Sequence, residues 1–168
     1  SSAGLQAGER RSVEELLYGL LLVSGNDAAV ALAVGLAGSE ARFSTWMNEV
    51  ARRLGATDSR FQNPHGLPHP QHLTTARDMA RIARAFWQHP LLRRIAATPK
   101  IQVGNHLWVN ENKLLGQSGV DGVKTGFTEA AGYCLVASAR RGERRLVSVV
   151  RGAQSDALRM SENHKLLN

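Results

Sequence analysis

The sequence contains little cysteine, few aromatic residues and no long apolar run. Cys134 is the only cysteine, which excludes an internal disulfide. Phe, Trp and Tyr make up 5% of the 168 residues, and they do not alternate with basic residues as in strands that bind RNA. No apolar run approaches the roughly 20 residues that cross a bilayer, and the beginning, SSAGLQAGERR, lacks the order of a secretory signal. We therefore expect no nucleic-acid partner, and membrane association only through segments that this sequence does not contain.

Several catalytic and cofactor motifs are also missing. No G-x-S-x-G elbow is present, although a Ser-His-Asp triad without that elbow stays open. The segment GVKTG lacks the preceding glycine of a phosphate-binding loop, which excludes a nucleotide site of that kind. His65, His69 and His72 lie in one Pro-rich segment, but their spacing matches no helical zinc motif. The sequence therefore predicts no metal site and no cofactor.

The residues that are present suit one folded domain with a basic surface. A hydrophobic content of 43% provides enough apolar surface for a core, and we expect residues 1–168 to form a single domain. The net charge is +7, from 21 Lys and Arg against 14 Asp and Glu, and this excess would favour an anionic partner. The basic residues are scattered in short clusters, however, which indicates a solvated surface rather than a dedicated binding patch.

Helical signals fill the first half of the chain. Ser12 with Glu15, and Thr75 with Asp78, have the spacing of capping boxes. Asn26 or Asp27 can cap a further helix. Apolar residues then recur at helical spacing over residues 12–23, 28–37, 40–54 and 76–86. Between the last two of these lies FQNPHGLPHPQHLTTARD, which predicts a surface loop because Pro, Gly and Asn interrupt regular structure.

Extended segments follow after Pro99. IQV and HLWV flank Gly104-Asn105, which predicts a hairpin with a two-residue turn. GVKT, YCLVASA and RLVSVVRG are three β-type runs, and we expect neighbouring antiparallel strands. The final SDALRMSENHKLLN predicts a closing helix. Helices, then strands, then a helix indicate an α+β fold rather than alternating βαβ units.

Two polar segments lie within apolar surroundings and are candidates for chemistry. Ser24-Gly25-Asn26 separates two predicted helices, and Lys124-Thr125-Gly126 ends an apolar run. Each alone is explained by structure, the first as a helix-capping turn and the second as a solvent-facing strand. Together they match the S-x-N and K-T-G motifs of penicillin-binding proteins and class A β-lactamases.

Longer phrases carry a closer resemblance. The sequence resembles the D-alanyl-D-alanine carboxypeptidases, the low-molecular-mass penicillin-binding proteins, in VEELLYGLLLVSGNDAAVALA, NPHGL, TARDMARIARA, VDGVKTGFTEAAGYCLVASA and SENHKLLN. The resemblance implies a helical cluster packed on an antiparallel sheet, as in β-lactamases and penicillin-binding transpeptidases, with the active site between them. It also implies a serine-type enzyme that trims the terminal D-alanine of peptidoglycan stem peptides, binds β-lactams and works outside the cytoplasm.

The resemblance assigns a role to each motif residue. Ser24 would relay a proton to the leaving amine, and Asn26 would orient the substrate amide. Lys124 and Thr125 would recognise the terminal carboxylate, because a cation beside a hydroxyl makes charge-assisted hydrogen bonds to it. Two further residues complete the expected substrate site: Gly126 would let the peptide lie close to the strand, and the backbone at Phe127 would donate to the oxyanion.

Two departures from the family pattern bear on activity. No serine here has a lysine three positions later, so the S-x-x-K motif that supplies the family's nucleophile and base is absent. We expect either a truncated carboxypeptidase domain without its N-terminal part, or a relative that lost catalysis, and in both cases no acyl-enzyme from this chain alone. Phe127 stands where many relatives have histidine, and it cannot ionise. A serine β-lactamase-like hydrolase, a non-catalytic peptidoglycan- or penicillin-binding module, and a basic domain that binds anions without specificity are the alternatives.

Overall fold

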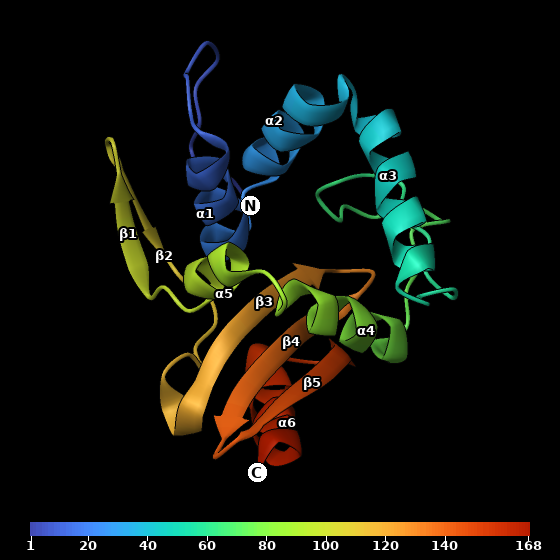
Figure 1. Cartoon of the computed structure of the whole chain (residues 1–168), viewed down its shortest axis with the longest axis vertical. Coiled ribbons are helices and arrows are strands. Elements are labelled where there is room, and N and C mark those ends of the chain that lie inside the picture. Colours follow the sequence, from blue (N-terminus) through green and yellow to red (C-terminus); the bar gives the residue numbers. More distant parts are fainter.

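Most helices begin where the sequence places a capping residue. The computed structural model describes residues 1–168 and contains six α-helices and five strands (Figure 1). The Ser12 side chain accepts a hydrogen bond from the Glu15 backbone N–H, and the Glu15 side chain accepts one from the Ser12 backbone N–H. This pair confirms the predicted capping box. Ser39 and Thr75 also cap helices through their side chains. The helices are α1 (Val13–Val23), α2 (Asn26–Ala37), α3 (Glu40–Arg53), α4 (Ala76–Phe86), α5 (Pro90–Ala96) and α6 (Asp156–Leu167).

Two local predictions were wrong, and one short helix was missed. The cap of α2 is Gly25, which makes no side-chain hydrogen bond, so neither Asn26 nor Asp27 is the N-cap. Helix α5 was not predicted, because its seven residues are too few to show a clear helical period. The carboxylate of Asp78 does not complete a capping box: it accepts hydrogen bonds from Asp58 N and Ser59 Oγ, both at 2.8 Å.

The strands form two separate antiparallel sheets. The predicted hairpin is confirmed as β1 (Lys100–Val103) paired with β2 (His106–Val109). The larger sheet has the order β3-β4-β5, and its bounds are β3 (Val120–Thr128), β4 (Gly132–Arg141) and β5 (Arg144–Ala153). Because β4 is central, β3 has a hydrogen-bonded neighbour on one side only. The strand that carries K-T-G is therefore an edge strand of this sheet.

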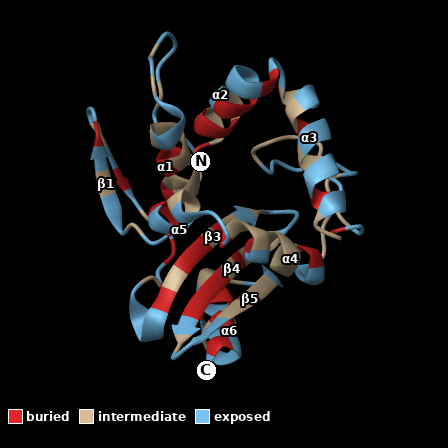
Figure 2. Cartoon of the chain, in the orientation of Figure 1, coloured by how far each residue is buried: buried red, intermediate tan, exposed pale blue.

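Two hydrophobic clusters hold the elements together. One lies among α1, α2, α5 and the hairpin, where Leu22, Ile95 and Trp108 are buried. The other lies between β4 and α6, where alternate strand residues such as Leu135 and Ala137 face the helix. Figure 2 shows these buried stretches on the inner side of α1 and α2 and along the centre of the sheet.

The arrangement is a sheet between helices, with an arch of helices beyond one end of the sheet. Helix α6 contacts β4 and β5, whereas α4 contacts β5 and α5 contacts β3. Figure 1 shows α6 behind the sheet, α4 in front of it, and α1, α2 and α3 arching beyond the end of β3. This arrangement confirms the expected α+β class with a helical cluster against an antiparallel sheet. None of the helices is long and apolar enough to cross a membrane.

Candidate active-site cleft

The residues singled out in the sequence meet in one cleft. A cavity of about 760 Å³ lies between the end of α1, the loop that follows α3, and the edge strand β3. Its lining includes all six sequence-predicted site residues, namely Ser24, Asn26, Lys124, Thr125, Gly126 and Phe127. The structure thus brings together two motifs that are about 100 residues apart in the sequence.

The Ser24-Gly25-Asn26 turn is tight because three segments meet there. Ser24 has φ 58° and ψ 35°, a left-handed conformation, and its N–H closes α1 on the carbonyl of Gly19. A Cβ on Gly25 would lie 2.8 Å from the Cβ of Ala3 and 2.8 Å from Oδ1 of Asp27, so only glycine fits. Asn26 then begins α2 and reaches the cleft from its first turn.

Asp27 anchors the N-terminal residues against this turn. Its carboxylate accepts hydrogen bonds from Ala3 N at 2.8 Å, Ser2 Oγ at 2.6 Å and Leu5 N at 3.1 Å. Partial burial raises the pKa of Asp27, but the hydrogen bonds outweigh it and lower that pKa to about 2. The first five residues are therefore held beside the turn by an ionised carboxylate.

The K-T-G segment lies on the free edge of the sheet. Lys124 pairs with Val136, Thr125 with Leu135 and Gly126 with Cys134, all on β4. A Cβ built on Gly126 would meet only the Cβ of Cys134, at 4.0 Å. Nothing within the chain therefore requires glycine at this position, and the space in front of it stays open to a ligand.

Lys124 lies in a desolvated part of the cleft. Its Nζ donates a hydrogen bond to the carbonyl of Thr125, 2.8 Å away. Burial lowers the pKa of Lys124 to about 8, the negative charge of Glu111 opposes that shift, and the positive charge of Arg159 adds to it. The lysine therefore loses its charge near pH 8, below the range in which an exposed lysine does so.

Arg159 is a cleft residue that the sequence reasoning missed. Its guanidinium donates from Nη1 to the carbonyls of Gly126 and Cys134 and from Nε to Asp156, at 2.9, 3.1 and 2.7 Å. It also lies over the ring of Tyr133, with 5.3 Å between the guanidinium carbon and the ring centroid. A single arginine within a helical pattern gives no signal of this role. Only the packing of α6 on the sheet brings it to the cleft.

Phe127 is the most exposed residue of the motif. The residue is 54% exposed, and its ring packs against Tyr133 with 4.3 Å between the centroids and an angle of 33° between the ring planes. An uncharged ring occupies this place, so the side chain contributes apolar contact and no titration.

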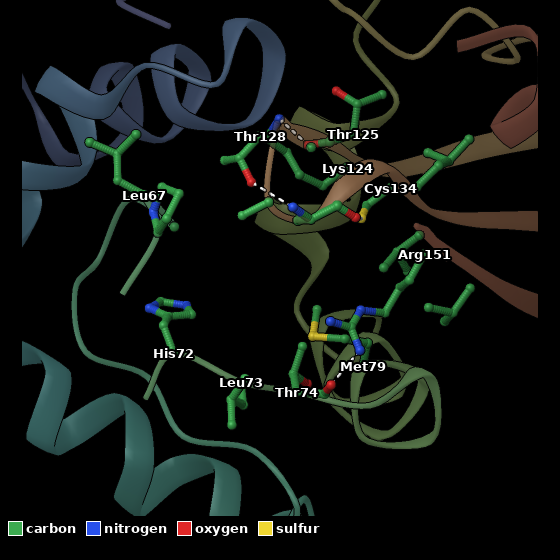
Figure 3. A pocket seen from close by; sticks show the side chains of 18 of the residues that line it. Leu67, His72, Leu73, Thr74, Met79, Lys124, Thr125, Thr128, Cys134 and Arg151 are labelled. Carbon is green, nitrogen blue, oxygen red and sulfur yellow. Dashed lines mark hydrogen bonds between the residues drawn. The ribbon is translucent and has the colours of Figure 1, made fainter. Parts of the chain in front are cut away.

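A second cavity of about 670 Å³ adjoins K-T-G on the side of the Pro-rich loop. Figure 3 shows this cavity with Lys124 and Thr125 of the strand at its upper edge, Leu67 and His72 of the loop on one side, and Met79 below. Burial, together with His65 and His69, lowers the pKa of His72. No group of three or more His, Cys, Asp or Glu side chains is placed to hold a metal ion.

An α+β fold with S-x-N at a helix junction and K-T-G on a sheet edge, both lining one cleft, is typical of the class that contains penicillin-binding proteins and class A β-lactamases. Within this class, one family matches the chain. The chain belongs to the D-alanyl-D-alanine carboxypeptidase family, whose model matches residues 1–155.

Curated relatives agree with this assignment. The chain is 44% identical to the D-alanyl-D-alanine carboxypeptidase DacC of Escherichia coli over 166 residues, covering 97% of this chain and 42% of that protein. It is 39% identical to DacF of Bacillus subtilis over 170 residues, covering 98% of this chain and 44% of that protein. The chain thus spans about two fifths of the length of these relatives.

Solved structures agree with the fold. Penicillin-binding protein 6B from Escherichia coli superposes with a TM-score of 0.92 at 40% identity, covering 99% of this chain and 53% of that one. A variant of a Streptomyces DD-transpeptidase superposes with a TM-score of 0.94 at 33% identity, covering 99% of this chain and 70% of that one. Both likenesses extend over almost the whole of this chain.

Proposed function

We propose that this chain is the substrate-recognition part of a serine-type D-Ala-D-Ala carboxypeptidase, which trims peptidoglycan stem peptides through an acyl-enzyme. The observation that carries the proposal is the convergence of Ser24, Asn26 and the K-T-G strand in one cleft. Membership in the carboxypeptidase family supports the choice over a β-lactamase-like hydrolase. The substrate and its β-lactam analogues would be met outside the cytoplasm, where peptidoglycan lies.

The carboxylate of the terminal D-alanine would bind at Lys124 and Thr125. Lys124 brings an ammonium and Thr125 a hydroxyl to the same cavity, and charge-assisted hydrogen bonds to a carboxylate are about twice as strong as neutral ones. Gly126 leaves the strand edge open, so the peptide backbone can lie along β3. Arg159 fixes the far side of this strand through the Gly126 carbonyl and adds positive charge behind it.

This chain would supply the residues that bind and orient the substrate during acyl transfer, but not the nucleophile. Expulsion of D-alanine requires a proton for the leaving amine, which Ser24 would deliver, while Asn26 would hold the substrate amide in line. The backbone N–H at Phe127 would donate to the oxyanion that develops on the scissile carbonyl. The nucleophile and its base are not assigned to this chain, because none of its serines has a lysine three residues later.

A titration calorimetry experiment tests recognition. The chain is titrated with diacetyl-Lys-D-Ala-D-Ala and with the peptide of L-Ala-L-Ala, and the wild type is compared with Lys124→Met. We expect reversible binding of the D,D peptide that falls by about tenfold or more in the variant, since a charge-assisted hydrogen bond contributes roughly 1.5 to 3 kcal/mol. Equal binding of both stereoisomers, or no dependence on Lys124, would contradict the proposal.

A labelling experiment tests the assignment of attack. The chain is incubated with a fluorescent penicillin and run on a denaturing gel, beside a full-length carboxypeptidase of the same family. We expect a labelled band from the full-length enzyme and none from this chain. A covalent band from this chain would show that one of its own serines is a nucleophile.

A further inference from the structure

An acidic side chain lies inside the proposed carboxylate site. Thr125 Oγ1 donates a hydrogen bond to Oε2 of Glu111, 3.1 Å away, and Glu111 lines the same cavity as Ser24 and Lys124. Thr125 is only 6% exposed, so its hydroxyl has few alternative partners. The Thr125 hydroxyl, which the proposed function assigns to the substrate carboxylate, is therefore already hydrogen-bonded to a carboxylate of the protein.

Glu111 is held in this place by its neighbours along the chain. Its own N–H donates to the carbonyl of Leu22 at the end of α1, 3.1 Å away. Asn110 donates from Nδ2 to the carbonyls of Ala96 and Thr98, and Asn112, which is buried, donates from Nδ2 to the carbonyl of Gly122. The segment is thus fixed on both sides of Glu111, which keeps this residue beside Thr125.

The direction of the hydrogen bond has a chemical consequence. A hydroxyl has one proton, and an ionised carboxylate can only accept, so the Thr125 proton points to Glu111. The oxygen of Thr125 then offers lone pairs to the cleft instead of a donor. A peptide carboxylate that binds here must replace Glu111 as the acceptor of the Thr125 hydrogen bond. It must also tolerate the negative charge of Glu111 nearby.

Glu111 also acts on Lys124, with the opposite sign. Its negative charge raises the pKa of Lys124 against the effect of burial, whereas Arg159 lowers it. The other charged or titratable side chains around the cleft are His65, His72, Lys113, Tyr133, Cys134 and Asp156. Asp156 is already engaged by Lys113 and Arg159, so Glu111 is the carboxylate that faces the K-T-G strand.

We propose that Glu111 is a positioning residue that sets the affinity and selectivity of this cleft for peptide carboxylates. It accepts the hydrogen bond of Thr125, and a bound carboxylate must compete with it for that donor. The inference rests on the proposed function, since it concerns the same site. It predicts a cleft that binds a carboxylate less tightly than K-T-G alone would, and that discriminates less strongly between a free and an amidated peptide terminus.

The test compares Glu111→Gln with the wild-type chain. A glutamine amide can donate to Thr125 Oγ1, which frees the hydroxyl proton for a ligand, and it removes the competing charge. Calorimetry at pH 6.5 with diacetyl-Lys-D-Ala-D-Ala should show binding tightened by about tenfold, the equivalent of 1.4 kcal/mol. The same peptide with an amidated C-terminus should bind the two proteins alike. Glu143→Gln is the matched control, because it removes the same charge from a side chain that is 96% exposed in the β4–β5 turn.

The pH dependence of binding is a second measurement, which a purely structural role of Glu111 would leave unchanged. Without Glu111 the Lys124 ammonium loses its neighbouring negative charge, so the loss of carboxylate binding at high pH should begin at a lower pH than in the wild type. Tighter binding at pH 6.5 together with an earlier alkaline loss supports the inference, and so does binding that appears only in the variant.

Other outcomes overturn it. Wild-type binding that depends on Lys124 but is unchanged in Glu111→Gln contradicts the role of Glu111 and leaves the proposed function standing. A parallel change for the free and the amidated peptide indicates a general structural effect and also contradicts it. Absence of binding in both proteins overturns the inference and the proposed function together.

Discussion

The Nη1 atom of Arg159 lies 2.9 Å from the carbonyl oxygen of Gly126, which ties the last helix to the strand that carries K-T-G. The same guanidinium reaches Cys134 and Asp156, and it is only 8% exposed. Helix α6 therefore does more than cover the sheet: it supplies a buried cation that fixes the backbone of the candidate site.

The first prediction concerns the stability that this arginine provides. Arg159→Met should lower the free energy of unfolding by about 3 kcal/mol, because it takes a donor from two partly buried carbonyls and leaves Asp156 without one of its partners. Urea denaturation followed by tryptophan fluorescence measures it. Arg140→Met is the matched control, since that side chain is 65% exposed and its removal should cost less than about 0.5 kcal/mol. Equal losses in both variants would contradict this view of Arg159.

The two motif glycines should respond in opposite ways to alanine. Gly126→Ala should fold with unchanged stability, because its Cβ meets nothing closer than 4.0 Å, but it should weaken D-Ala-D-Ala peptide binding by roughly tenfold through steric obstruction of the strand edge. Gly25→Ala should instead lower stability by about 1 to 3 kcal/mol, because its Cβ would overlap Ala3. Thermal unfolding and calorimetry separate the two effects. Strong destabilisation by Gly126→Ala would show that the open space is needed by the fold.

Binding of a peptide carboxylate should weaken as the pH rises through about 8. The pKa of Lys124 is lowered to about 8 by burial, so the ammonium is present below this pH and lost above it. The affinity should then fall by up to about tenfold per pH unit, with the bound carboxylate moving the onset somewhat upward. Calorimetry from pH 6 to 10 measures this, and Lys124→Met should bind weakly with a flat profile over the same range.

Lys124 should affect stability in the opposite direction over that range. An unfolded lysine titrates near 10.5, so between about pH 8 and 10.5 the unfolded chain binds more protons at this residue than the folded chain. The free energy of unfolding of the wild type, relative to Lys124→Met, should therefore rise with pH in this window. A fall would mean that the lysine is not buried as described.

Asp27 should make the N-terminal segment sensitive to acid. Its pKa is about 2 in the folded chain, against an ordinary value of 3.8, so its contribution to stability is present above about pH 4 and is lost as the pH falls toward 2. Asp27→Asn should lower the free energy of unfolding at pH 6 by about 1 to 2 kcal/mol, since it loses charge-assisted hydrogen bonds from Ala3 and Leu5. The difference in melting temperature between the two proteins should shrink from pH 4 to pH 2, and a constant difference would argue against this role.

Much of the fold could be predicted from local signals. Ser12 and Thr75 mark helix starts because a side-chain cap is a property of a few adjacent residues. Gly104-Asn105 marks the hairpin for the same reason. Helix α5 was missed because it is too short for a periodic pattern, and Gly25 was missed as a cap because its role depends on contact with Ala3.

The candidate site divides in the same way. Ser24, Asn26 and the K-T-G residues could be named because they form contiguous motifs. Arg159 and Glu111 could not, since each is an ordinary charged residue in its local sequence and reaches the cleft only through tertiary packing. The charge balance of the cleft was therefore outside the reach of the sequence, whereas its hydrogen-bonding motifs were not.

The Pro-rich loop has an anchored base. The bridge between Arg60 and Leu73 and the hydrogen bonds from Asp58 and Ser59 to Asp78 close the loop where it leaves the fold. Since the entropic cost of closing a loop grows only slowly with its length, an insertion at residues 68–70, beyond the NPHGL segment, should disturb folding little. The shape of this rim of the cleft can therefore change without loss of the strand and the turn opposite it.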